Sequence, residues 1–189
     1  MLIQRSEDPM DWFWYFLFYS FLGFLVEVVY VRLRGEVKRD RKCRLILPVC
    51  PVYGLGALAI LLLPAGIRSN PLLLFPAAAL ACTGVEYVVG LFYEKVFRVT
   101  FWDYSHLPLN LSGRVCPPFS LCWGALAVLV LGLIHPRLAP LVSAIPPWLV
   151  FPAAALWAAD TILTALVLRR AGTTDALRWY LRPVRRSAA

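Results

Sequence analysis

Long apolar stretches separated by short polar segments dominate this chain. A transmembrane helix needs about 20 consecutive, mostly apolar residues to cross about 30 Å of hydrocarbon. Stretches of that kind lie at residues 12–31, 45–67, 72–92, 117–134 and 148–168, so we predict five transmembrane helices. The predicted fold class is an all-α integral membrane protein, with a single helical domain over residues 1–168 and a basic cytoplasmic tail over residues 169–189.

The composition excludes a soluble domain. Hydrophobic residues make up 60% of the chain and charged residues 16%, and the mean hydropathy is +0.69, whereas soluble domains are typically about 45–50% apolar. Glu7, Asp8 and Asp11 precede the first stretch in place of a basic region, and no small-residue cleavage site is evident. We therefore expect a retained first helix and not a signal peptide.

Basic residues gather on connectors that would share one side of the membrane. Of the 19 Lys and Arg residues, seven lie in the first connector, three in the third and six in the tail, which leaves Arg5, Arg68 and Arg137. The positive-inside rule then predicts an outside N-terminus and an inside C-terminus, in a bacterial cytoplasmic membrane. The net charge of +8 fits contact with the anionic inner leaflet. No motif that reads nucleic acid accompanies it, so we expect membrane lipids and no nucleic acid as partners.

The connectors differ in character. Residues 32–44 form a short basic connector that we expect to be solvated, residues 68–71 a tight outer turn, and residues 135–147 an outer loop with four prolines. In the tail, residues 173–175 are suited to cap a short helix. Its apolar face would lie on the inner leaflet, and a frayed basic tail is the alternative. The residues on that face would be Leu177, Tyr180 and Leu181.

Three carboxylates interrupt the apolar stretches at similar depths. Glu27, Glu86 and Asp160 lie roughly 6–12 Å inside the expected inner face, at a rise of about 1.5 Å per residue. A carboxylate at that depth costs a few kcal/mol unless it is paired, hydrated or protonated. Their common level predicts a shared cavity, although each could instead hydrogen-bond a neighbouring helix. For Asp160, which Thr161 and Thr164 accompany, both interpretations stay open.

A polar and aromatic segment lies between the third and fourth stretches. It contains the sequences WDYS at residues 102–105 and NLSGR at residues 110–114. We expect it to be an inner connector that re-enters the membrane, with Arg114 as the counter-charge for the carboxylates; an interfacial connector is the alternative. The candidate substrate-binding residues are Glu27, Tyr53, Glu86, Glu94, Trp102, Asp103, Tyr104, Asn110 and Arg114.

Several motifs together point to a known family. They are YSFLG at residues 19–23 ahead of Glu27, PVYGLGA at 51–57, Glu86-Tyr87 ahead of Glu94-Lys95, WDYS at 102–105 and NLSGRVC at 110–116. Over about residues 13–125 the chain resembles the bacterial family of "putative ABC-transporter type IV" permeases. The chain departs from the family where an Arg-Gly-Phe-Leu-x-Gly-Pro run is usual, since KCRLILP stands at residues 42–48.

Other chemistries find little support. The chain has no G-x-x-x-x-G-K-[ST] phosphate loop, so any ATP hydrolysis requires a partner. Disulfides are unexpected for its five cysteines at the inner face or within lipid, and their spacings do not match a zinc site. Ser105 and His106 are adjacent in the chain, and neighbouring side chains rarely aim at each other as a nucleophile and base must.

Two main hypotheses about function remain, and the resemblance favours the first. The first is a transport component with a carboxylate and arginine cavity for a polar or zwitterionic solute, which needs no cofactor. It would act as a homo-oligomer or with partner subunits, such as a separate ATPase. The second is a membrane enzyme acting on a lipid headgroup or lipid-linked phosphate, with Glu27, Glu86 and Glu94 holding a divalent cation. A regulatory or assembly subunit is a third.

Overall fold

Helices make up nearly all the regular structure of the part of the chain that the computed structural model describes, residues 9–34 and 43–178. Four continuous apolar helical segments are long enough to cross a membrane, which confirms the all-α membrane class. The first is α1 (Pro9–Arg34), and the second is α4 (Pro71–Phe92), which a π-helical turn (Tyr93–Phe97) continues. The third consists of α5 (Pro117–Leu129), a π-helical turn (Val130–Ile134) and α6 (His135–Ser143). The fourth is α7 (Val150–Ala171), which a 3-10 turn (Pro147–Leu149) precedes.

The second predicted span differs from the expectation. Residues 45–67 contain an extended segment, the 11-residue helix α2 (Pro51–Leu61) and the one-turn helix α3 (Ala65–Arg68). The prolines explain this, because Pro51 sits in the first turn of α2 and Pro64 precedes α3, and proline has no N–H to donate within a helix. At about 1.5 Å per residue, α2 is only about 16 Å long. The orientation of the two termini stays a prediction.

The predicted outer loop at residues 135–147 is also more helical than expected. α6 covers residues 135–143 despite Pro136 and Pro140. The π-helical turn directly before α6 adjusts the backbone hydrogen bonds, and so accommodates Pro136 within the continuous helical segment. By contrast, the tight turn at residues 68–71 is as predicted, with the Asn70 side chain accepting a hydrogen bond from the N–H of Leu72.

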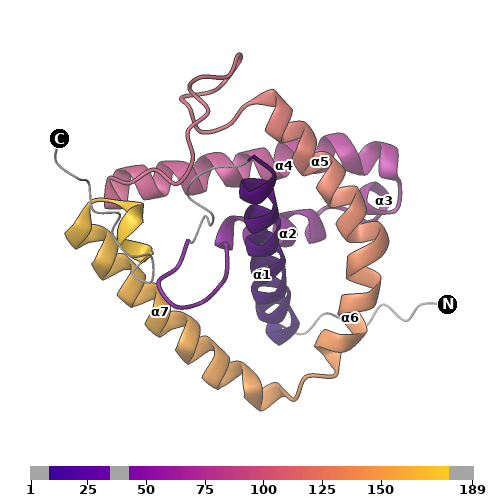
Figure 1. Ribbon diagram of the computed structural model, residues 1–189. Coiled ribbons are helices and arrows are strands. Elements are labelled where there is room, and N and C mark those ends of the chain that lie inside the picture. Colours follow the sequence, from indigo (N-terminus) through magenta and orange to yellow (C-terminus); the bar gives the residue numbers. More distant parts are fainter. Residues whose placement is uncertain (1–8, 35–42, 179–189) are drawn as a thin grey trace, which may run out of the picture.

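The helices form a frame around a short central pair. In Figure 1, α4, the continuous α5–α6 and α7 surround α1 and α2, and both views show α1 running at a steep angle to α4. α2 packs against both α1 and α4, while α4 packs along α5. The loop of residues 98–116 follows the π-helical turn after α4 and leads into α5, as both views show. A hydrophobic core of buried side chains from α1, α2, α4, α5 and α6 fills the space between these helices.

Two glycines bring α1 and α2 into close contact. A Cβ atom at Gly23 would lie 2.2 Å from Cγ of Tyr53, and one at Gly54 would lie 2.5 Å from the carbonyl oxygen of Phe16. Neither position can hold a larger residue without a shift of the helices. This close approach fixes where Tyr53 lies relative to α1, and so positions one wall of the cavity described below.

α7 is attached to the rest of the fold through a polar clamp, which consists of Arg44, Asp160, Thr161 and Thr164. Asp160 is fully buried and accepts hydrogen bonds from the N–H groups of Ile46 (2.8 Å) and Leu47 (3.3 Å). Thr164 accepts one from the N–H of Leu45 (3.0 Å). The question left open for Asp160 is thus answered in favour of a contact between segments.

Arg44 corrects the expectation of a solvated basic connector. Its side chain is buried, its Nη1 donates to Oγ1 of Thr161 (2.6 Å), and its guanidinium lies 5.2 Å from the centre of the Trp157 ring. The threonine and the indole face replace part of the water that the charge loses. Residues 35–42 of the connector lie outside the described residues, as does the predicted tail helix beyond residue 178.

Residues 169–171 of the predicted tail belong to α7, which is followed by a short 3-10 helix, Thr174–Leu177. Thr173 caps it, as the sequence predicted, by accepting a hydrogen bond from the N–H of Asp175. Leu177 is fully buried and packs with Val99 and Leu168. The tail therefore begins as a segment packed on the end of α7.

Candidate functional site

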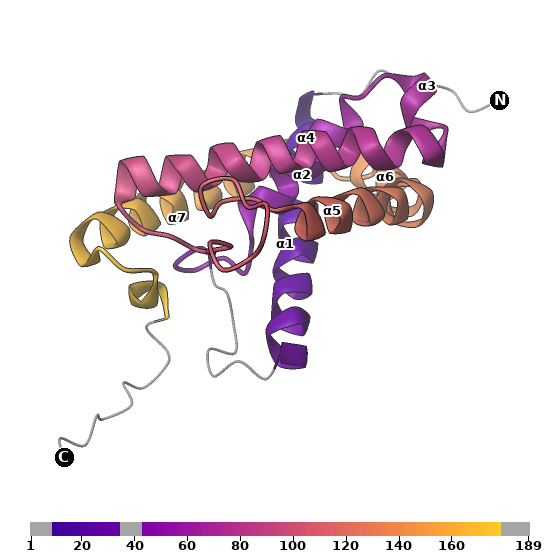
Figure 2. The same ribbon diagram turned by 90° about the horizontal axis from the view of Figure 1, so that it is seen from above.

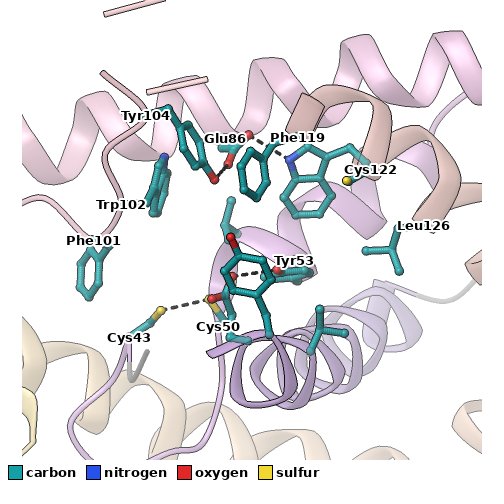
Figure 3. Close-up of a pocket in the computed structure, with 15 residues that line it drawn as sticks. Cys43, Cys50, Tyr53, Glu86, Phe101, Trp102, Tyr104, Phe119, Cys122 and Leu126 are labelled. Atoms are coloured by element: carbon teal, nitrogen blue, oxygen red, sulfur yellow. Dashed lines mark hydrogen bonds between the residues drawn. The ribbon is translucent and has the colours of Figure 1, made fainter. Parts of the chain in front are cut away.

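A cavity of about 270 Å³, here called the main cavity, lies between α1, α2, α4, α5 and the extended segments beside them. Figure 3 shows its labelled side chains converging from these elements. Two carboxylates and seven aromatic rings dominate its lining. The lining residues are Val26, Glu27, Tyr30, Cys43, Cys50, Val52, Tyr53, Glu86, Phe101, Trp102, Tyr104, Phe119, Cys122, Trp123 and Leu126.

Glu27 and Tyr53 form the part of the lining that α1 and α2 contribute. The Tyr53 hydroxyl donates a hydrogen bond to Oε1 of Glu27 at 2.8 Å. Gly23, one helical turn before Glu27, lets Tyr53 approach α1 closely enough for this contact. The Tyr53 ring in turn packs on Trp123, with 4.9 Å between ring centres. Glu27 is therefore held in place by a side chain that itself faces the cavity.

Glu86 is buried on the opposite helix, α4, with an exposed fraction of 5%. The Tyr104 hydroxyl donates to Oε1 at 3.0 Å, and the indole N–H of Trp123 donates to Oε2 at 2.9 Å. The first of these contacts is visible in Figure 3. Tyr104 also stacks on Phe119, with 4.4 Å between ring centres. Among the described residues, both side chains that donate hydrogen bonds to Glu86 thus line the main cavity.

The loop of residues 98–116 holds its own shape, which delivers Tyr104 to the cavity. Asp103 accepts hydrogen bonds from the backbone N–H and the hydroxyl of Ser105 (2.8 and 3.0 Å), in the Asx-turn that the sequence offered as an alternative. These two bonds lower the pKa of the exposed Asp103 carboxyl. Asn110 donates to the carbonyl of Leu107 and accepts from the N–H of Gly113. Gly113 has φ +68, and a Cβ there would lie 2.9 Å from Asp103.

Arg114 lies in a second pocket of about 240 Å³, here called the arginine pocket, beside the main cavity. Its guanidinium forms an ion pair with Glu94 at 2.5 Å and lies over the ring of Tyr87. The backbone carbonyl of Arg114 accepts a hydrogen bond from the indole N–H of Trp102 at 2.8 Å. Phe101 and Trp102 line both spaces and so lie between them.

The expected single cluster is therefore divided into two. Glu27, Tyr53, Glu86, Trp102 and Tyr104 line the main cavity. The arginine pocket is lined by Glu94, Trp102, Asp103 and Arg114, while Asn110 lines neither space and shapes the loop.

A cation site made from Glu27, Glu86 and Glu94 is not assembled. Within residues 9–34 and 43–178, no three His, Cys, Asp or Glu side chains come together in a group that could hold a metal ion. Glu94 is directed instead to Arg114. The structure thus gives the enzyme hypothesis no metal-binding carboxylate triad.

Cys43 and Cys50 line the edge of the main cavity as a pair of thiols. Both are buried, and their Sγ atoms lie 3.0 Å apart, as Figure 3 shows. The spacing of seven residues in the sequence did not suggest this contact. It arises because the clamp on α7 bends residues 44–47, which returns Cys43 to the first turn of α2.

An apolar groove of about 460 Å³ adjoins the main cavity. The two share Val26, Tyr30, Tyr53, Trp123 and Leu126 as lining residues. The groove continues along the exposed apolar face of α1, where Leu25, Val29 and Leu33 line it, and along α5. The main cavity thus adjoins an apolar surface of the kind that faces lipid.

Several lining residues were not among the sequence candidates. Trp123 and Phe119 contribute the indole donor and a stacking ring, yet both lie in an apolar stretch where aromatic residues are ordinary. The sequence does indicate that Trp123 and Phe119 lie on the same face of α5, because they are four residues apart, about one helical turn. What the sequence could not supply is which face of α5 points toward α4.

A sequence model of the family described as "Putative ABC-transporter type IV" matches residues 14–165 of the chain. This range includes every residue that lines the main cavity and the arginine pocket. No curated protein and no solved structure matches the chain.

Proposed function

The chain belongs to the "Putative ABC-transporter type IV" family, and from this premise we propose that it is a permease subunit whose solute binds in the main cavity. The observation that carries the proposal is Glu86. A carboxylate buried in the middle of a membrane helix is costly, and its partners, Tyr104 and Trp123, are cavity-lining side chains. Such a group is more readily explained by a ligand than by packing.

A polar ligand would reach the cavity without passing the arginine. The expected cavity combined carboxylates with Arg114, but Arg114 is engaged by Glu94 in the neighbouring pocket. The solute of the main cavity therefore meets carboxylates, phenols and indoles. Entry from the lipid phase is supported by the apolar groove, which shares five lining residues with the cavity.

Energy for transport has to come from outside this chain. The sequence contains no phosphate loop, so we propose either a separate ATPase subunit or coupling to an ion gradient in the bacterial cytoplasmic membrane. The exposed apolar face of α7, which includes Phe151 and Ile162, is available for lipid or for further subunits. Assembly as a homo-oligomer or with partner subunits is part of this proposal.

Proteoliposomes containing only this protein test the proposal. Uptake of radiolabelled amines, amino acids and choline would be measured with no gradient, with a proton or sodium gradient, and after adding a candidate ATPase subunit. We expect gradient-dependent or ATPase-dependent uptake of at least one solute, reduced more than tenfold in Glu86→Gln and unchanged in the surface variant Asp175→Asn. Chelator-sensitive turnover of a lipid-like substrate without any gradient would instead identify an enzyme.

A further inference from the structure

Cys43 and Cys50 place two thiols side by side at the edge of the main cavity. Their Sγ atoms lie 3.0 Å apart (Figure 3), and the two residues are 7% and 4% exposed. A disulfide joins its sulfur atoms at about 2.0 Å, so a bond between these two requires them to approach by only about 1 Å. The pair is therefore placed to pass between a dithiol and a disulfide.

The contact between the two thiols depends on the tertiary fold. The N–H of Cys50 donates to the carbonyl of Ser20 on α1 at 2.8 Å. The segment directly after Cys43 is held to α7 by the clamp, in which Asp160 accepts hydrogen bonds from two of its backbone N–H groups. Each cysteine thus adjoins backbone that is fixed to a different helix, and these anchors bring the sulfur atoms together.

The surroundings of the two thiols are apolar and aromatic. Both cysteines line the main cavity and pack in one cluster with Tyr53, Phe101 and Trp123. Tyr53 and Trp123 also line the apolar groove beside the cavity. Aromatic side chains make favourable stacked or edge-on contacts with other planar rings. A reactant with a planar ring and an apolar tail, arriving from the lipid phase, therefore fits this part of the molecule.

Joining two thiols requires a reactant that takes up two electrons. Soluble peroxides and disulfides oxidise thiols that are exposed to water, whereas Cys43 and Cys50 are buried. The same burial limits contact with glutathione and thioredoxin, which keep cytosolic thiols reduced. Quinones dissolve in the membrane, have a planar ring and accept two electrons together with two protons. They are the class of oxidant that matches this site.

We propose that Cys43 and Cys50 are a redox-active dithiol that reduces a lipid-soluble quinone, with the quinone ring in the main cavity and its tail in the apolar groove. The S–S bond forms as the two S–H bonds break. Two electrons pass to the quinone and two protons to its oxygens, and the hydroquinone leaves. The reaction needs neither a gradient nor an ATPase, so it goes beyond the proposed function and does not depend on it.

Counting thiols in the full chain tests the proposal. The protein would be purified in dodecyl maltoside, reduced, freed of reductant, and mixed without oxygen with decylubiquinone, whose ring carries no hydrogen that a thiol could replace. Of the five thiols of the chain, we expect those of Cys43 and Cys50 to be lost, with one hydroquinone formed for each protein molecule. Mass spectrometry of the alkylated and digested protein should find these two residues joined.

Single substitutions separate this pair from the other cysteines. Cys43→Ser and Cys50→Ser are each expected to keep all their remaining thiols and to form at least about tenfold less hydroquinone, because a disulfide requires both sulfurs. Cys116→Ser is the matched control, since Cys116 is, like Cys50, a buried residue directly before a helix that begins with proline. This control should lose two thiols, as the unaltered protein does.

The groove is tested with side-chain size. Leu126 lines both the main cavity and the groove, whereas Leu121 on the same helix is exposed and lines neither. Leu126→Trp is expected to slow quinone reduction at least about threefold, because the larger side chain occupies space that the tail requires. Leu121→Trp should leave the rate unchanged. Oxidised glutathione, which dissolves in water, should oxidise the pair at least about tenfold more slowly than decylubiquinone.

The unaltered protein decides the proposal whether or not each variant folds. Retention of all five thiols, or loss of thiols without a link between Cys43 and Cys50, would overturn it. A link formed equally fast by oxidised glutathione would overturn the quinone as the reactant, and equal rates in Leu126→Trp and Leu121→Trp would overturn the groove as its route. Solute uptake by proteoliposomes is a separate measurement, so this proposal and the proposed function can each fail alone.

Discussion

Asp160 and Glu86 are both acidic side chains buried within apolar helices, yet they differ in what donates hydrogen bonds to them. Asp160 accepts from two backbone N–H groups, those of Ile46 and Leu47, and lines none of the cavities described above. Glu86 accepts from two side chains, Tyr104 and Trp123, which line the main cavity together with it.

The difference separates a structural acid from one suited to bind a ligand. Backbone N–H groups have no freedom to leave Asp160 without moving the whole segment that carries them. A phenol and an indole can rotate or shift, so a ligand can compete for Glu86 without unfolding its surroundings. Both residues are buried within a helix, and they differ in their donors and in whether they line the main cavity.

The largest effect is expected from removing Asp160. Asp160→Ala would remove the acceptor of the part-buried N–H groups of Ile46 and Leu47, and an unsatisfied buried group typically costs about 1–3 kcal/mol. We expect the free energy of unfolding in detergent to fall by about 3 kcal/mol, measured by circular dichroism in a denaturant titration. Loss of less than about 1 kcal/mol would mean that the clamp on α7 does not hold the fold.

The second effect concerns the other half of the clamp, Arg44 and Thr161. Arg44→Met keeps the apolar stem but removes the hydrogen bond to Thr161 and the contact with the Trp157 ring. We expect the free energy of unfolding to fall by about 2 kcal/mol. In a double-mutant cycle with Thr161→Val, the two changes should be non-additive by about 1 kcal/mol. Fully additive effects would contradict a direct contact.

A smaller effect on stability is expected at Glu86. Glu86→Gln leaves one donor, from Tyr104 or Trp123, without its acceptor, but it also removes a charge that is costly to bury. These terms oppose each other, so we expect a change in unfolding free energy of about 1 kcal/mol or less. A loss as large as that of Asp160→Ala, measured in the same titration, would remove the distinction between the two acids.

The smallest effect is a pH response at Asp103. Hydrogen bonds from Ser105 lower the pKa of this exposed carboxyl in the folded protein. Its contribution to stability is therefore fully present above the unfolded pKa of about 3.9 and is lost as the pH falls through the lower folded pKa. Hydrogen exchange at the Ser105 amide should quicken, relative to its intrinsic rate, only as the pH falls below the unfolded pKa of about 3.9 and through the lower folded pKa. In Asp103→Asn this acid-dependent step should be absent.

The sequence predicted the four long spans because each is a continuous apolar stretch of sufficient length. It did not predict how the second stretch breaks at Pro51 and Pro64, since proline in an apolar run is compatible with a kinked span as well as with two short helices. The sequence also does not predict the short helix at residues 135–143, because prolines at positions 136 and 140 are more typical of a loop than of a helix.

For the candidate site, the sequence supplied residues but not their grouping. Glu27, Tyr53, Glu86 and Tyr104 were expected together, and the structure places them on one cavity. The pairing of Arg114 with Glu94 depends on the π-helical turn at residues 93–97, which changes the direction of the Glu94 side chain relative to an uninterrupted α-helix. The bend that gives Asp160 its backbone partners arises between segments more than a hundred residues apart, a distance over which periodicity carries no information.

That long separation has a consequence for how the protein is made. Ile46 and Leu47 leave the ribosome 114 and 113 residues before Asp160 does. Because synthesis proceeds at about 5–20 residues per second, roughly 6–23 seconds pass before Asp160, the acceptor of their N–H groups in the finished protein, is synthesised. Until α7 is inserted, water or lipid headgroups must satisfy these groups, so the segment ahead of α2 reaches its final bend only when the last helix arrives. In nascent chains that stop before α7, the lining of the main cavity at Cys43 should therefore be incomplete. Membrane quality-control proteases would act on chains in this incompletely folded form.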